Sequence, residues 1–197
     1  MDRKGILFVI SGPSGVGKGT VKDAVLERIK DMRLSISVTT RAPRQGELNG
    51  REYFFAGEQE FQDLIEKDQF LEWADVYSHK YGTPRDFVMK NLQSGLDVLI
   101  EIDIQGALKV KSRMPDGVFI FIAPPSTKEL QSRLCGRGKD SQESIIERLA
   151  SCEKEMEHMK YYDYVVVNDV VKKAADQIEA IVMAERCKVK NIKIEVI

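Results

Sequence analysis

A glycine-rich stretch near the start of the chain has the residue types of a phosphate-binding loop. Ser11–Thr20 reads SGPSGVGKGT, in which glycines let backbone amides turn toward an anion and Lys18 can reach the terminal phosphates of a nucleotide. The usual pattern has a serine or threonine directly after the lysine, where its hydroxyl helps to hold magnesium. Here Gly19 stands at that position and Thr20 follows it, which predicts nucleotide binding with a differently built metal site.

A glycine-rich turn with a solvated lysine would use the same residues, so the context has to decide between the two interpretations. The run Ile6–Ile10 is continuously apolar, as in a strand buried on both faces of a parallel sheet. After the loop, apolar residues recur at helical spacing, which predicts a helix over about Lys18–Lys30. Strand, glycine-rich turn and helix form the setting of a phosphate-binding loop, and we favour that interpretation.

A second group of residues that could bind an anion follows in Ser37–Arg44 and Gly50–Tyr53. Arg41, Arg44 and the phenol of Tyr53 could converge on another phosphate, through charge-assisted hydrogen bonds of about 1.5–3 kcal/mol each. Taken alone, two arginines in a polar loop are more often surface charges.

Three carboxylates are candidate ligands. Glu72 carries a carboxylate that could accept from two adjacent donors, but taken alone it is better explained as a solvent-facing strand residue beside Trp73. Asp103 follows the apolar run Val98–Ile102, as a metal-linked carboxylate often does in phosphate-loop proteins, and Glu101 could share that task. An acidic pair at a strand end can also be surface charge, but its closeness to the loop in the expected sheet favours a substrate or metal role.

Further apolar runs predict the sheet that positions these residues. Buried strands that alternate with helices argue for a parallel α/β sandwich with right-handed crossovers. The first helix after the loop helix is expected to have Thr83 as its N-cap and Gly95 just past its end. The expected strands are Ile6–Ile10, Val98–Ile102, Val118–Ile122 and Tyr164–Val167, and the later helices are Pro84–Gln93, Gly106–Arg113, Thr127–Leu134, Ser144–Lys160 and Val171–Lys188.

Two segments break this alternation. From about Ser37 to Tyr81 short β-like pieces lie between polar turns, which predicts a small inserted β-rich lobe, and the polar break 136–143 suits a mobile lid between two helices. We therefore expect one compact unit in three parts. They are a core of 1–36, 85–125 and 160–197, a lobe of 37–84 and a lid region of 126–159.

The composition is that of an ordinary globular protein. The 197 residues carry a net charge of −1 with no dense basic run, which argues against a nucleic-acid partner. Three scattered cysteines and two histidines lack metal-ligand spacing, so neither a disulfide framework nor a zinc site is expected. The N-terminal apolar run is too short for a secretory signal or a membrane span. We expect a cytoplasmic protein with reduced thiols and no membrane partner.

A series of short motifs, in this order along the chain, resembles the guanylate kinases. The resemblance extends from about Gly5 to Glu185, and the ordered set is far more specific than any single motif. Besides the phosphate loop, the motifs are Ser37–Arg44, Gly50–Tyr53, Glu72–Ala74, Tyr81–Thr83, Glu101–Gly106, Ala123–Ser126, Gly136–Gly138 and Val167–Asp169.

The resemblance implies a P-loop NTPase-type α/β core, a GMP-binding lobe and a helical lid. It implies transfer of the γ-phosphoryl group of ATP to GMP, and to dGMP, with Mg²⁺ as cofactor. The implied catalytic residues are Lys18, Arg41, Arg137 and Arg148. The implied ATP-binding residues are Gly12, Pro13, Ser14, Gly15, Val16, Gly17, Lys18, Gly19, Thr20, Arg133, Arg137 and Asn168. GMP would be bound by Ser37, Arg41, Arg44, Tyr53, Glu72, Tyr81, Thr83 and Asp103.

The late threonine fits the same resemblance, since the Lys-Gly-Thr ending is similar to that of nucleoside monophosphate kinases. We expect Asp103 or Glu101 to hold the magnesium through water, while Thr20 faces the α-phosphate. Two alternatives stay open: a guanylate-kinase-like module that binds peptides without catalysis, and a phosphotransferase with another small acceptor. The sequence also leaves open whether the protein is a monomer or a homodimer.

Overall fold

A parallel sheet organises most of the computed structural model, which describes residues 3–76, 78–135 and 154–192. The sheet is five-stranded, and every neighbouring pair of strands in it is parallel. The four strands expected from the apolar runs are confirmed, whereas the short edge strand β2 was not expected. In sheet order the strands are β2 (Met32–Leu34), β7 (Asp97–Glu101), β1 (Leu7–Ser11), β8 (Val118–Ala123) and β9 (Tyr164–Val167).

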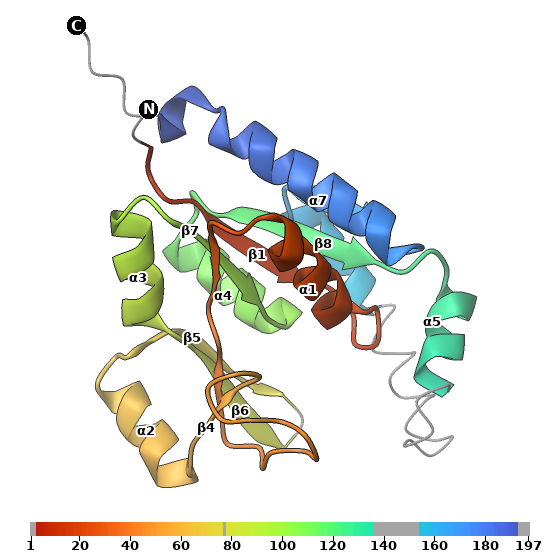
Figure 1. The fold of residues 1–197 in the computed structure, drawn as a ribbon. Helices are drawn as coiled ribbons and strands as arrows, with labels where there is room; N and C mark the ends of the chain where they lie inside the picture. The colour runs from red at the N-terminus through yellow and green to blue at the C-terminus, as the bar shows by residue number, and fades with distance from the viewer. Residues whose placement is uncertain (1–2, 77, 136–153, 193–197) are drawn as a thin grey trace, which may run out of the picture.

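Helices cover both faces of this sheet (Figure 1). Phe8 and Ile10 of β1 pack with residues of α1 (Lys18–Arg28) and α7 (Val171–Arg186). The alternate residues of β1 pack on the opposite face, against α3 (Arg85–Gln93) and α4 (Ile104–Arg113). Burial of both faces explains why β1 is an uninterrupted apolar run. The predicted α/β fold of P-loop type is therefore confirmed.

A smaller sheet lies below the first in Figure 1 and is formed by the chain between β2 and α3. Helix α2 (Glu58–Glu66) packs on it, with the ring centroids of Phe61 and Phe70 4.6 Å apart. The expected β-rich character is confirmed, but α2 was not expected. In sheet order the strands are β4 (Phe54–Phe55), β3 (Val38–Thr39), β6 (His79–Pro84) and β5 (Phe70–Val76), and only β3 and β4 pair in parallel.

Two helix starts differ from the sequence-based expectation. The N-cap of α3 is Pro84 rather than Thr83, and the Thr83 hydroxyl instead donates to Glu72. Helix α4 begins at Ile104 because the carboxylate of Asp103 caps it, accepting a hydrogen bond from the Gly106 amide at 2.7 Å.

The remaining elements follow β8 in the chain. Helix α5 (Thr127–Cys135) agrees with its prediction, while most of the helix expected over Ser144–Lys160 lies outside the described residues. Short 3-10 turns occupy His158–Tyr161 and Val189–Asn191. Within the described ranges, no helix combines the length and the apolar character that crossing a membrane requires.

A buried carboxylate at the start of β7 ties the N-terminal segment and α7 to the sheet. Asp97 is fully buried and accepts hydrogen bonds from the Ile6 amide at 2.9 Å and from Arg186 Nε at 2.7 Å. Arg3 reaches the same carboxylate with both guanidinium nitrogens. Two cationic side chains and one amide thus offset the cost of burying this charge.

We predict that Asp97→Asn lowers the free energy of unfolding by about 3–5 kcal/mol, because it leaves two partly buried arginines without their counter-charge. The matched control is Asp31→Asn. Asp31 pairs with the same two arginines, but its side chain is 57% exposed, so we expect a loss below about 1 kcal/mol. Urea titration followed by circular dichroism measures both, and equal losses would contradict the assigned role of Asp97.

Candidate active site

The glycine-rich loop connects the end of β1 to the start of α1, as the sequence predicts. Gly12 has a φ of 148°, and a Cβ on it would lie 2.2 Å from the carbonyl oxygen of Ile122 in β8. Gly17, the N-cap of α1, has a φ of 93°, and a Cβ there would lie 2.7 Å from Asn168 Nδ2. Both positions therefore require glycine, for their conformation and for the close approach of neighbouring strands.

The backbone amides of the loop and the N-terminus of α1 are groups that could bind an anion. A carboxylate already uses this capacity: the Ser14 amide donates to Glu155 Oε2 at 3.4 Å. Lys18 folds back over the loop, where its Nζ donates to Gly12 O at 2.6 Å and to Pro13 O at 3.0 Å. Sequence reasoning did not single out Glu155, which lies within the predicted lid region 126–159.

Two predicted nucleotide-binding residues, Asn168 and Arg133, are linked to the loop by hydrogen bonds. Asn168 directly follows β9, and its Nδ2 donates to Val16 O at 2.8 Å. Arg133 in α5 donates from Nη1 to Asn168 O at 2.9 Å. The Asn168 side chain is buried, and among the described residues its Oδ1 has no hydrogen-bond donor. It therefore offers one buried acceptor beside the loop.

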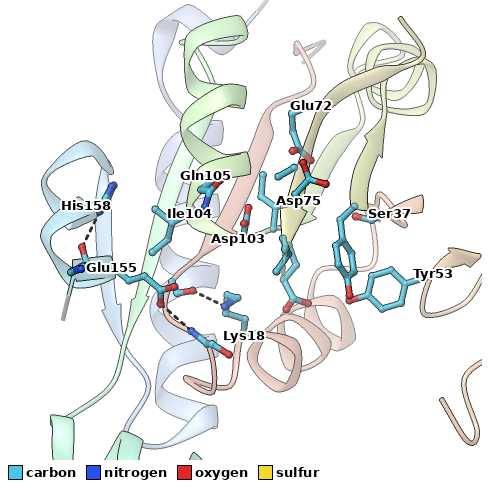
Figure 2. A pocket seen from close by; sticks show the side chains of 18 residues that line it. Lys18, Ser37, Tyr53, Glu72, Asp75, Asp103, Ile104, Gln105, Glu155 and His158 are labelled. Atoms are coloured by element: carbon cyan, nitrogen blue, oxygen red, sulfur yellow. Dashed lines mark hydrogen bonds between the residues drawn. The ribbon is translucent and has the colours of Figure 1, made fainter. Parts of the chain in front are cut away.

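A pocket of about 490 Å³ opens between the loop and the smaller sheet. Figure 2 shows Asp103 between Lys18 on the loop side and Glu72 in β5. The two sheets thus bring together residues that are far apart in the sequence. Of the predicted site residues, Gly12, Ser14, Lys18, Ser37, Tyr53, Glu72, Tyr81, Glu101 and Asp103 line this pocket.

Two carboxylates form the acidic end of the pocket. The Glu72 side chain is buried, and Thr83 Oγ1 donates to its Oε1 at 2.7 Å. Burial raises the pKa of Glu72 to about 7; the Thr83 hydrogen bond works against this shift, and the charge of Asp103 adds to it. Burial also raises the pKa of Asp103, against the opposing effects of the Gly106 amide and of Lys18. Glu72 therefore changes charge near neutral pH, and the two carboxylates together favour a ligand with several donors.

Two tyrosines lie on another wall of the pocket, and an arginine packs against one of them. The rings of Tyr53 and Tyr81 meet edge to face with centroids 5.7 Å apart, and the Arg41 guanidinium lies 5.4 Å from the Tyr53 centroid. Burial raises the pKa of Tyr53 to about 12, so its phenol stays a hydrogen-bond donor at neutral pH. Tyr53 and Arg41 can therefore both donate hydrogen bonds to a phosphate at neutral pH.

Arg41 is held by a residue that sequence reasoning missed. Its Nη2 donates to both oxygens of Glu47, each at 2.9 Å. Arg44 contributes its backbone amide to the same carboxylate at 2.7 Å, and its side chain is exposed. Neither arginine is among the described residues that line the pocket, so the convergence of both guanidinium groups on a phosphate stays a prediction. The sequence signal for this contact was Glu47, an acidic residue three positions after Arg44.

Glu101 and Asp103 serve different sides of the site although they are close in sequence. Glu101 Oε2 lies 3.4 Å from Lys22 Nζ, and both its oxygens lie within 4 Å of where a Cβ on Gly19 would be. Asp103 instead lies beside Glu72. The described residues contain no cluster of three or more His, Cys, Asp or Glu side chains that could enclose a metal. The predicted lid arginines, Arg137 and Arg148, lie outside the described residues.

A parallel sheet with a phosphate-binding loop after its central strand, beside a pocket for a second ligand, defines a P-loop phosphotransferase of the nucleoside monophosphate kinase class. Residues 4–185 match the family model for guanylate kinase. The chain belongs to the guanylate kinase family, whose members are ATP:GMP phosphotransferases, and the family and enzyme class predicted from the motifs are confirmed.

Similar proteins cover almost the whole chain. It is 62% identical over 192 residues to the guanylate kinase of Syntrophomonas wolfei, a match that covers 98% of each chain. It is 56% identical to the guanylate kinase of Caldanaerobacter subterraneus, over 97% of this chain and 93% of the relative. The crystal structure of guanylate kinase from Anaplasma phagocytophilum has a TM-score of 0.82 at 37% identity, over 96% of this chain and 90% of that one.

Proposed function

We propose that this chain transfers the γ-phosphoryl group of ATP to GMP or dGMP, with guanine read by Glu72 at the acidic end of the pocket. The observation that carries the assignment is the buried Glu72 carboxylate, bonded to Thr83 and next to Asp103. Guanine offers N1–H and an adjacent amino group, so one ionised carboxylate can accept from both. Adenine would turn the N1 lone pair toward it and leave a buried charge unpaired.

The phosphate of GMP would lie on the tyrosine wall. Tyr53 and Tyr81 supply phenol donors, and Arg41 supplies a cation once it shares its bond to Glu47 with the phosphate. Ser37, which lines the pocket, and Thr83 complete the base contacts, while Arg44 would have to turn inward. This arrangement points the acceptor oxygen toward Lys18.

ATP would bind along the loop. The amides of Gly12–Thr20 would surround its phosphates, after Lys18 leaves the two carbonyls and Glu155 leaves the Ser14 amide. Asn168 Oδ1 could accept from the adenine amino group, with Arg133 holding Asn168 in position. From the family resemblance we assign Arg137 and Arg148 to the charge that develops on the transferred phosphoryl group, an interaction worth about 10³–10⁵ in rate in related systems.

Mg²⁺ would accompany ATP and neutralise the charge on its phosphates. Hard oxygen ligands and retained water suit this ion, and Glu101 at the end of β7 offers a carboxylate next to the loop position where Gly19 lacks a hydroxyl. Asp103 can share the water shell, but its Oδ1 already accepts from Gly106. We therefore assign Glu101 to the metal side and Asp103 mainly to the base.

The direct test is ADP release with Mg²⁺–ATP and a panel of acceptors: GMP, dGMP, IMP, AMP and UMP. We expect turnover with GMP and dGMP, weaker turnover with IMP, which lacks the amino group, and background rates with AMP and UMP. Turnover with AMP or UMP but not GMP would indicate another phosphotransferase. Absence of turnover with every acceptor would favour the peptide-binding module.

We also predict that use of GMP depends on pH through Glu72. Only the ionised carboxylate can accept from two donors, and this form is lost as the pH falls through about 7. The KM for GMP should therefore rise about tenfold between pH 8 and pH 6. Glu72→Gln should have a high KM for GMP at every pH, and comparing the two proteins subtracts the titration of the GMP phosphate. A wild-type profile that parallels that of the variant would contradict this role.

A further inference from the structure

Gly106 is a buried glycine whose presence the backbone does not explain. It is the third residue of α4, and it is not among the glycines with positive φ. Glycine is disfavoured in helices relative to alanine, because it loses more conformational freedom on folding. The reason for glycine at this position must therefore lie in what surrounds its Cα.

The surroundings of Gly106 are the two carboxylates of the acidic end. A Cβ on Gly106 would lie 2.9 Å from Asp103 Oδ1, 2.9 Å from Glu72 Oε2 and 3.2 Å from Glu72 Cδ. All three distances are shorter than ordinary van der Waals contact. Thr83 holds the other oxygen of Glu72 at 2.7 Å, and the Gly106 amide holds Asp103 Oδ1 at 2.7 Å. A methyl group here cannot be accommodated without moving one or both carboxylates.

We propose that Gly106 is a specificity-determining positioning residue: its missing side chain lets Glu72 and Asp103 close on the same face of the pocket, where together they read guanine. This inference rests on the proposed function of Glu72. Gly106 does not itself need to touch the nucleotide; it acts through the two carboxylates that flank it.

A side chain at position 106 should impair substrate recognition and leave the fold unchanged. The atoms in the way are the ends of two side chains rather than backbone, so they can shift by a few tenths of an ångström. The helix itself would accept alanine, and the Gly106 amide that caps Asp103 would remain. Hydrogen bonds between the two carboxylates and the donors of a bound base do not tolerate such a shift, since small misplacements reduce turnover strongly.

The test compares Gly106→Ala with Gly57→Ala in the full chain. Gly57 precedes α2 in the smaller sheet's segment, and a Cβ there would meet no atom within 4 Å. Kinetics with GMP, IMP and ATP and thermal melting are measured for both variants and the wild type. For Gly106→Ala we expect kcat/KM for GMP to fall at least about tenfold, with KM for ATP within about twofold and an unchanged melting curve. The preference for GMP over IMP should contract, and Gly57→Ala should resemble the wild type.

A compensating change makes the assignment specific. Glu72→Asp withdraws the carboxylate by one methylene group, so in the Gly106→Ala background it should restore part of the lost GMP turnover. In the otherwise wild-type protein, Glu72→Asp should only reduce GMP turnover. If the two substitutions lower kcat/KM for GMP by factors that simply multiply in the double variant, the side chains at positions 72 and 106 do not compete for the same space. That result would contradict the proposal.

The remaining outcomes separate this inference from the proposed function. Failure of the wild type to use GMP would overturn the function itself. If the wild type uses GMP and Gly106→Ala has the same kinetics as Gly57→Ala, only the inference about Gly106 would be overturned. Unfolding of Gly106→Ala, or equal losses for GMP and ATP, would also overturn it, because the glycine would then serve the backbone rather than the base.

Discussion

The electrostatics of the pocket depend on one buried carboxylate, Glu72, whose hydrogen-bond donor is a neutral hydroxyl. Glu72 is 4% exposed, and the hydroxyl of Thr83 satisfies only part of its hydrogen-bonding capacity. The cost of burying such a group appears as a pKa near 7 and is offset only when a ligand brings further donors. This is why we propose that a base with two adjacent N–H groups completes the acidic end, and that a base with a lone pair at that position is rejected.

The two sheets divide the chemistry between them. The parallel sheet fixes the phosphate loop, because β1, β8 and β9 bring Gly12, Ile122 and Asn168 together at their carboxyl ends. The smaller sheet carries Glu72 and the tyrosines, and α4 links the two through Asp103 and Gly106. If each ligand is held by a different sheet, as we propose, a substitution at Gly106 should alter base selection without changing the loop.

The sequence predicts the parallel sheet and the loop well, because burial of both strand faces and the glycine spacing are local signals. It does not predict β2, since a three-residue edge strand carries a weak local pattern, and α2 was not expected although its segment is amphipathic. Thr83 was expected to cap a helix and instead bonds to Glu72, a contact between paired strands that no local rule contains. Glu47, Glu155 and Gly106 were missed for the same reason: their roles depend on partners brought close by the fold.

The most direct test of the account is an experimental structure with GMP bound. The account predicts that guanine N1–H and the amino group each donate to the Glu72 carboxylate at about 3 Å, with Asp103 beside them and the phosphate on Tyr53, Tyr81 and Arg41. A complex in which guanine lies away from Glu72, or in which Glu72 bonds only to Thr83, would contradict it.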